Sequence, residues 1–190
     1  MIRNHFIGTF VFFFALGILW ASGTVASELD SKTLLQKGAW SVELTHDTSD
    51  GTLWCSASTY NRGNQSFGLA AFDSGLLALI ISDPYWSLKT RPIRFLLDID
   101  YKRWTIDGSA SEDYVSLNMN NPEKSAEFIK DLMRGNAVAV LNDNGNRLAT
   151  FTLNGSYAAL DALVDCWSRI TKDDPFTNRT DPFGASTDPF

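Results

Sequence analysis

Two aspartates separated by one residue, Asp98 and Asp100, are the carboxylates best spaced to act as a general acid and base, since alternate residues of a strand point to one face. Arg94 and Lys102 share that face, which favours an exposed charge ladder over a catalytic pair. The only imidazole after residue 26 is that of His46, and no Gly-x-Ser-x-Gly elbow precedes a helix. The residues therefore favour a non-catalytic protein, with a secreted carboxylate-dependent glycan hydrolase as the alternative.

Aromatic side chains supply a second kind of candidate site. Five of them are candidates for a sugar-stacking platform: Trp54, Tyr85, Trp86, Trp104 and Tyr114. Most of these rings are expected in the core, but the tetrapeptide Asp83-Pro84-Tyr85-Trp86 has the composition of a loop. Because binding residues concentrate on loops, Tyr85 and Trp86 are the ligand-binding candidates.

The segment 173–190 repeats Asp-Pro-Phe three times, at intervals of seven residues. Proline removes a backbone donor and restricts the residue before it, so the register fits neither a coiled coil nor a strand, and the segment is predicted to be a disordered acidic tail. A groove with an apolar pocket and a cationic rim would recognise such repeats. The candidate partner-binding residues are Asp174, Phe176, Asp181, Phe183, Asp188 and Phe190. The alternative is a passive, solvated tail.

Composition limits the partners. The chain has 190 residues, with 16 Lys and Arg against 22 Asp and Glu, and a pI near 4.8. Nucleic acid is excluded as a partner because phosphate recognition needs a surplus of cations. Two His and two Cys leave little room for a zinc site, so we predict no metal and no cofactor. The acidic balance leaves a third function open, an inhibitor or immunity protein that masks a cationic enzyme.

The first 26 residues have the order of a secretory signal. Arg3 precedes an apolar block from Phe6 to Ala21, and small residues follow up to Ala26, after which we predict cleavage. An uncleaved anchor is the alternative, since the block approaches the length that spans a bilayer. We expect a periplasmic or secreted protein with no stable membrane insertion after cleavage. Its mature form has 15 basic and 22 acidic residues, a formal charge of -7.

In an oxidising compartment Cys55 and Cys166 most simply pair with each other. The bridge would close a loop of roughly 110 residues and stabilise the fold by about 4 to 5 kcal/mol in the chain-entropy model. A reactive thiol is the alternative, but the sequence has no Cys-x-x-Cys spacing.

Alternating apolar and polar residues predict half-buried antiparallel strands. The predicted strands lie at 39–45, 52–60, 66–72, 76–82, 94–100, 102–106, 113–119, 137–141 and 148–153. Asn121-Pro122-Glu123 predicts the start of a helix that ends at Arg134-Gly135, and Ser156 begins a second helix that runs to about residue 170. The chain is thus predicted to be mainly β, an antiparallel sandwich or barrel-like domain over 27–172 with two helices in its C-terminal half.

Short motifs in the predicted domain resemble a known family. They are Trp40-Ser41-Val42, then Trp54-Cys55-Ser56-Ala57, and the closing run from Phe151 to Ser156 followed by Leu163 and Cys166. The run resembles small secreted bacterial envelope proteins of the invasion-associated locus B type. The resemblance implies a disulfide-containing β-sandwich in the periplasm or outside the cell, with no catalytic residues. The sequence therefore predicts a secreted, non-catalytic binding or envelope-interaction protein.

Overall fold

A computed structural model describes residues 29–172 of the chain. The predicted signal, 1–26, and the Asp-Pro-Phe segment, 173–190, lie outside the described residues. The elements run, in order, β1 (Leu29–Lys37), β2 (Trp40–Asp47), β3 (Leu53–Tyr60), β4 (Ser66–Phe72), β5 (Leu77–Ser82), β6 (Leu88–Ile99), β7 (Lys102–Glu112), β8 (Tyr114–Asn118), α1 (Pro122–Arg134), β9 (Ala137–Asn142), β10 (Arg147–Thr152) and α2 (Ser156–Lys172). The mainly β class with two C-terminal helices is confirmed.

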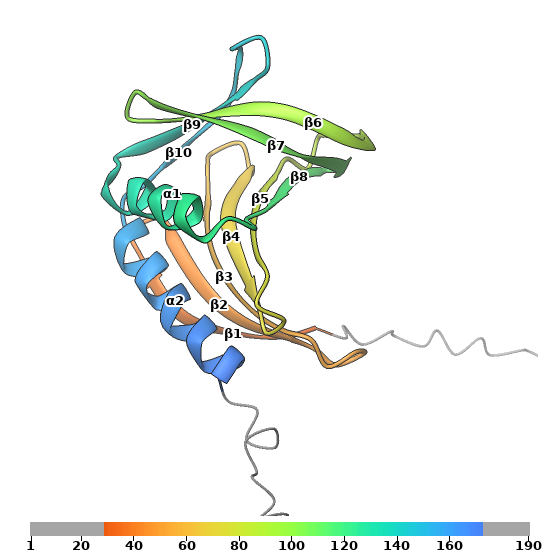
Figure 1. Cartoon of the computed structure of the whole chain (residues 1–190), viewed down its shortest axis with the longest axis vertical. Coiled ribbons are helices and arrows are strands. Elements are labelled where there is room, and N and C mark those ends of the chain that lie inside the picture. Colours follow the sequence, from red (N-terminus) through yellow and green to blue (C-terminus); the bar gives the residue numbers. More distant parts are fainter. Residues whose placement is uncertain (1–28, 173–190) are drawn as a thin grey trace, which may run out of the picture.

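The ten strands form one antiparallel sheet in the order β1-β2-β3-β4-β5-β8-β7-β6-β9-β10. The sheet is strongly curved, and both helices lie along the same side of it (Figure 1). It does not close into a barrel, because β1 and β10 are its two edges and no ladder joins them. The curvature nevertheless brings β10 near β2 and β3, where the Trp40 indole N–H donates to the Thr152 carbonyl at 3.1 Å.

The core fills the inner side of this curve. Alternate residues of each strand point inward, as the period-two pattern predicts. The buried inward side chains include Val42, Cys55, Ala57, Phe67, Leu69, Leu79, Leu97, Val140 and Phe151. Tyr60, Ser66, Ser82 and Tyr114 belong to the opposite set of alternating positions, and the Ser66 and Ser82 hydroxyls are 2.6 Å apart.

The predicted start of α1 is confirmed in detail. The Asn121 side chain accepts a hydrogen bond from the Lys124 N–H at 2.9 Å, and Pro122 follows the cap. Phe128 and Leu132 turn inward from this helix, and the Phe128 ring meets Trp104 edge-on at 5.3 Å between centroids. Neither described helix has the length and apolar composition needed to span a membrane.

Helix α2 packs against β1 to β4. Its inward face carries Leu160, Leu163 and Cys166, and Cys166 forms a disulfide with Cys55 of β3. The predicted pairing is therefore confirmed, and the two cysteines are 111 positions apart in the sequence. The Trp167 indole N–H also donates to the Phe72 carbonyl at 2.9 Å, so the last helix is tied to β3 and β4 by a covalent bond and a hydrogen bond.

The turn between β1 and β2 interlocks with the turn between β10 and α2. The Ala39 N–H donates to the Asn154 carbonyl at 3.2 Å. Gly155 has φ +102° and lies against the Lys37 carbonyl, where a Cβ atom would collide with that oxygen. Because only glycine fits both this conformation and this space, the interlock depends on Gly155.

The sequence pattern missed one strand and shortened two others, since β7 runs to Glu112 rather than to residue 106. β1 was not predicted because residues 29–37 lack apolar alternation, and all but one of them are exposed. β6 begins at Leu88 rather than at residue 94, since the pairing with β7 continues past Pro92. Residues 29–37 of β1 and 88–93 of β6 therefore take their strand conformation from pairing with a neighbouring strand rather than from a buried face.

Candidate ligand-binding site

The loop Asp83-Pro84-Tyr85-Trp86 is held in place by the side chain of Asp83. One carboxylate oxygen accepts the Tyr85 N–H at 2.9 Å, and the other accepts the Gln65 side-chain amide at 2.6 Å. The Asp83 N–H donates to the Asp113 carbonyl at 2.9 Å, which ties the loop to the start of β8. Only 8% of Asp83 is exposed. The loop is therefore a fixed part of the fold, with its two aromatic residues in defined positions.

Those two aromatic residues have different surroundings. Tyr85 is 87% exposed, whereas Trp86 is half-buried and packs against the core. Trp86 also borders a hollow of about 310 Å³. Apart from two arginines and an asparagine, the hollow is lined by apolar side chains, among them Leu88, Ile93, Phe95, Val115, Val140 and Leu148. Of the two candidates, Trp86 therefore lies where an apolar group of a ligand would be bound.

Beside the hollow, part of β6 has an unpaired edge. β6 pairs with β7 along its length, but it pairs with β9 only from Phe95 to Ile99. Residues 88–94 therefore have no described strand on their other side. Apart from Pro92, which has no N–H to donate, this edge presents backbone N–H and C=O groups that can accept an added strand.

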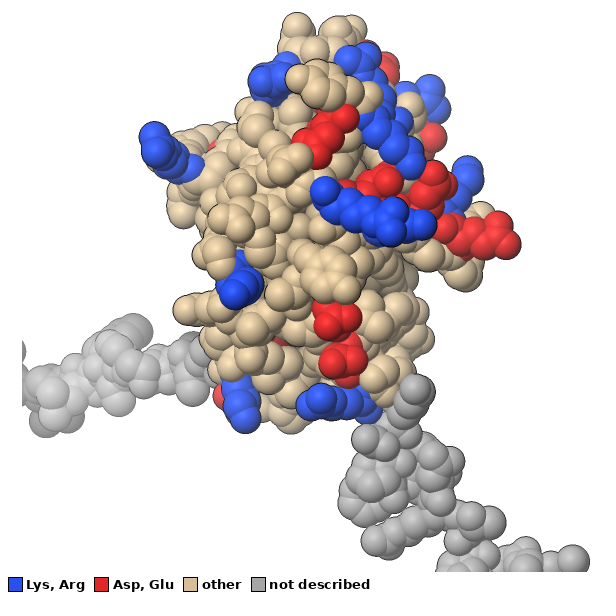
Figure 2. All heavy atoms as spheres, turned by 90° about the vertical axis from the view of Figure 1, so that its left-hand side faces the viewer, with Lys and Arg blue, Asp and Glu red and all other residues tan. Residues whose placement is uncertain are grey.

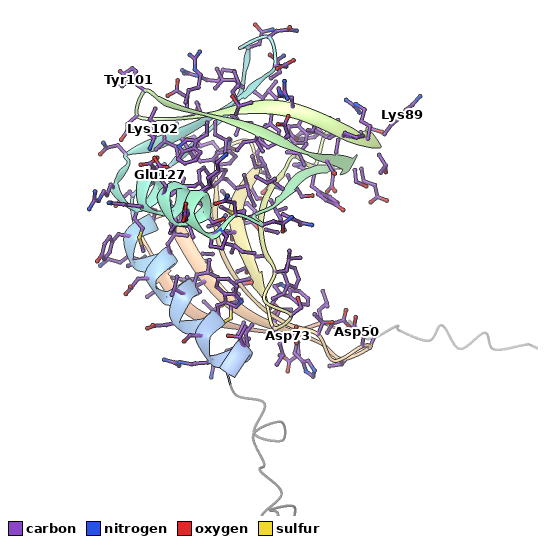
Figure 3. The ribbon with its side chains drawn as sticks, in the orientation of Figure 1. Asp50, Asp73, Lys89, Tyr101, Lys102 and Glu127 are labelled. Atoms are coloured by element: carbon purple, nitrogen blue, oxygen red, sulfur yellow. A yellow bond between two sulfur atoms is a disulfide. The ribbon has the colours of Figure 1, made fainter. Side chains whose placement is uncertain are left out.

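Cationic side chains border this edge. Arg94 forms an ion pair with Asp107 of β7 at 2.7 Å. The hydrogen bond from Arg94 lowers the pKa of the Asp107 carboxyl, and the same bond raises the pKa of Arg94. Lys89 and Arg91 form no ion pair with any described residue. Lys89 is at the end of β6 farthest from Tyr101 (Figure 3). Arg91 lines the hollow, and its guanidinium donates one hydrogen bond to the Lys89 carbonyl at 3.1 Å, so an anion would be bound by its other N–H groups.

Two further tyrosines lie at the same end of the sheet. The strand register places Tyr60 opposite Ser66, Ser66 opposite Ser82, and Ser82 opposite Tyr114. Tyr60 is 61% exposed and Tyr114 37%. Tyr114 was a candidate from the sequence, but Tyr60 was not, because only the register between strands brings it into this row.

The remaining aromatic candidates lie elsewhere. Trp54 packs on Phe72 with ring centroids 6.0 Å apart. Trp104 packs on Phe128, and its indole N–H donates to Asp131 at 3.0 Å. The five rings therefore do not form one platform. Three of them, Tyr85, Trp86 and Tyr114, come to the same end of the sheet.

Asp98 and Asp100 do not form the pair that their spacing suggested. β6 ends at Ile99, and Asp100 is in the turn with φ +46°, so the two residues do not share one face of a strand. Asp100 accepts the Asn136 N–H at 2.7 Å and the Ala137 N–H at 3.3 Å, and these backbone hydrogen bonds lower its pKa. A general acid needs a raised pKa, so the turn gives Asp100 the opposite property.

The expected charge ladder is also rearranged by this turn. Lys102 reaches α1, where its ammonium lies 2.7 Å from both Glu127 and Asp131 and 4.9 Å from the centre of the Trp104 ring. These bonds raise the pKa of Lys102. On the face shown in Figure 2, blue and red side chains are intermixed in the upper part, and much of the rest is uncharged. Opposite charges are thus intermixed in the upper part of this face, and they include the pairs of Lys102 with Glu127 and Asp131.

In the described part of the chain, the side chains that could ligate a metal or activate a nucleophile are not grouped together. His46 is half-buried on β2, and no hydrogen bond joins it to a serine within residues 29–172. Within the same range, no three His, Cys, Asp or Glu side chains come together as metal ligands would.

A larger hollow of about 430 Å³ lies beside α1 and Trp167. Its lining has no charged side chain and comes from turns, from α1 and from α2. The hollow beside β6 differs because it combines an unpaired strand edge, a guanidinium that forms no ion pair with a described residue, and a fixed aromatic loop. These three features together define it as the candidate site.

The fold and the site together define the class of protein: a curved antiparallel β-domain with an apolar hollow beside an unpaired strand edge. No model of a known protein family matches the sequence, and no curated protein matches it. Among solved structures, the chain is similar to invasion-associated protein B from Bartonella henselae, with 16% identity and a TM-score of 0.49. The match covers 72% of this chain and 99% of that chain. This is a weak structural resemblance, and no functional argument rests on it.

Proposed function

We propose that the protein is a secreted, non-catalytic binding protein that holds an extended peptide segment against the free edge of β6. The observation that carries the proposal is the unpaired stretch 88–94 beside an apolar hollow. In strand addition the backbone bonds supply affinity, and pockets for alternate side chains supply specificity. The hollow would take an apolar or aromatic side chain of the peptide, and Arg91 would take a carboxylate.

Secretion is supported by the order of residues in the predicted signal and by the disulfide. Disulfides persist in oxidising compartments and are rare in the cytosol. Cys55 and Cys166 are both buried and bonded to each other, which gives them a structural role. A structural bridge of this kind suits a protein of the periplasm or the extracellular space.

The hydrolase alternative loses its support from geometry. It required two carboxylates facing one substrate, one of them with a raised pKa. Asp100, in the turn between β6 and β7, instead accepts the Asn136 and Ala137 N–H groups at the start of β9 and has a lowered pKa, while Asp98 accepts the Tyr101 N–H at 2.9 Å. Both carboxylates are engaged in shaping the backbone at the far end of β6 from the hollow.

The experiment measures binding of a synthetic peptide, Thr-Val-Asp-Thr-Phe-Val-Thr, to the full chain by fluorescence anisotropy. We expect micromolar affinity, at least about tenfold weaker binding of the same peptide with Lys in place of Asp, and a similar loss in Ile93→Asp, which puts a charge at the hollow. Leu34→Asp is the matched control, since Leu34 is an exposed apolar residue of the other edge strand, β1. Equal binding by both variants would refute the proposal.

A further inference from the structure

We infer that the hollow beside β6 binds the chain's own segment Asp188-Pro189-Phe190, with Phe190 against Ile93 and Asp188 against Arg91. The inference rests on the proposed function, because it names the peptide that the site takes. It makes the third Asp-Pro-Phe repeat an internal ligand, which any outside peptide would have to displace.

The spacing of the two partners matches. Arg91, Ile93 and Phe95 are alternate residues of β6 in an unbroken register with β7, and all three line the hollow. Their side chains therefore share one face, with the cation two residues before the apolar side chain. In Asp-Pro-Phe the acid likewise precedes the ring by two residues. A segment laid parallel to β6 places acid beside cation and ring beside Ile93.

Proline is compatible with this arrangement. It cannot donate to a ladder, but it is tolerated on an edge strand with its nitrogen facing away from the partner. The residue before proline is restricted to extended conformations, which are those of a strand. Asp188 is therefore already biased toward the conformation that pairing with β6 requires.

Charge favours the same pairing. Residues 173–190 contain four Asp and one Arg, a balance of -3. At the hollow, neither Arg91 nor the nearby Lys89 forms an ion pair with a described residue, although the Arg91 guanidinium donates to the Lys89 carbonyl at 3.1 Å, while Asp107 is already bonded to Arg94. Glu112, opposite Leu88 on β7, its neighbour Asp113, and Asp143, whose charge acts on Arg94, are acids near this edge and reduce the attraction. The attraction is exposed and therefore falls with added salt.

Reach selects the third repeat. α2 ends at the bottom of the molecule in Figure 1, whereas β6 and β7 cross its top. A domain of 144 residues has a radius of gyration of about 15 Å and is about 40 Å across. From Lys172, an extended chain reaches about 13 Å at Phe176, about 36 Å at Phe183 and about 60 Å at Phe190. Only the last repeat can pass around the surface to the hollow.

Attachment to the domain lowers the affinity that the segment needs. A flexible tether whose typical end-to-end distance matches the span gives an effective concentration of the order of 1 mM; here the residues between Lys172 and Asp188 must be nearly extended to pass around the domain, so the effective concentration is well below that. A contact with a dissociation constant near this lower effective concentration already occupies the hollow about half of the time. An outside peptide then binds more weakly than it would to an empty hollow.

The test uses the full chain and the peptide Thr-Val-Asp-Thr-Phe-Val-Thr as the probe. Phe190→Ala removes the proposed ligand, and we expect the probe to bind about twofold to fivefold more tightly. Phe176→Ala is the matched control, since it removes the same ring from a repeat that cannot reach, and its affinity should equal that of the unaltered chain. An unchanged affinity in Phe190→Ala would overturn the inference while the proposed function stands.

A second measurement separates the inference from the proposed function. The free peptide Ala-Ser-Thr-Asp-Pro-Phe should displace the probe from the Phe190→Ala variant, and Arg91→Glu should weaken that displacement at least about tenfold. Probe binding without displacement would refute the inference alone. No probe binding to any variant would refute the proposed function. Sedimentation of the unaltered chain should show one species at all concentrations; growth of a dimer that Phe190→Ala abolishes would overturn binding within one chain.

Discussion

The two halves of the curved sheet are finished in different ways. Over β1 to β4, α2 covers the inner face and the Cys55–Cys166 bond fixes it there. Around β6, β8 and β9 neither of the described helices lines the hollow, and residues 88–94 pair with no second strand within 29–172. In the first half, the apolar surface is buried under α2 and stabilises the fold. In the second half, part of the apolar surface lines the hollow and is accessible to a ligand.

This difference assigns different roles to the same kinds of residue. Trp40 is 2% exposed and its indole N–H donates to a carbonyl of β10, so its bond closes the fold. Trp86 packs on the core with one side and borders the hollow with the other. Changes to the covered half should therefore act on stability, and changes around the hollow should act on binding.

Removal of the disulfide should have the largest effect on the covered half. In the double variant Cys55→Ala, Cys166→Ala we expect the free energy of unfolding to fall by about 4 to 5 kcal/mol, because the loop closed by the bridge is long. Urea unfolding followed by circular dichroism measures the change. The folded fraction should still bind the probe peptide with unchanged affinity. Loss of binding in that folded fraction would show that the binding half depends on the disulfide, which contradicts the separate roles of the two halves.

Gly155 tests the interlock between the two turns. Gly155→Ala should cost about 1 to 3 kcal/mol from backbone strain, with a further loss from the collision with the Lys37 carbonyl. Gly51 is the matched control, since its φ is +80° and no atom lies within 4 Å of a Cβ built there. Gly51→Ala should therefore show the strain alone. Equal losses in thermal unfolding would show that the turns do not depend on this contact.

Asp83 tests the binding half. Asp83→Ala removes the acceptor of two hydrogen bonds, from Tyr85 and from Gln65, so unfolding should become easier by about 1 to 2 kcal/mol. Because the loop then no longer fixes Trp86, probe affinity should fall more than for Gly51→Ala, which lies far from the hollow in the chain. Asp83→Asn keeps one oxygen acceptor, so its probe affinity should lie between those of Asp83→Ala and Gly51→Ala. The reverse order would remove Asp83 from the site.

The turn at Asp100 should give the smallest effect, and its sign follows from the pKa. The folded pKa of Asp100 is below its usual value, so its ionised form stabilises the fold. That contribution is present above the unfolded pKa, near 4, and is lost as the pH falls through the folded value. Asp100→Asn should lower the melting temperature slightly at pH 7 and reduce its fall below pH 4. A variant with the unchanged acid profile would contradict this.

Local patterns predicted most elements because their signals are local. The Asn121 cap, the Ser156 start and the alternation along β3 each depend on neighbours within a few residues. β1 escaped prediction because its conformation comes from pairing with β2, and residues 88–93 of β6 and 107–112 of β7 escaped it because they pair with each other. The candidate site depends on such pairings. Tyr85 and Trp86 could be proposed from loop composition, whereas Tyr60 and the free edge depend on strand register.

The separation of the two cysteines also sets an order of events during biosynthesis. The chain is made from its N-terminus, so Cys55 is produced 111 residues before Cys166. Every strand of the sheet is complete before the sulfur that closes the fold exists, since α2 follows β10. The disulfide can therefore form only in chains that have been synthesised as far as Cys166 in the last helix. A chain cut short after β10 keeps Cys55 as an unpaired thiol, a chemical mark by which incomplete molecules can be told from finished ones.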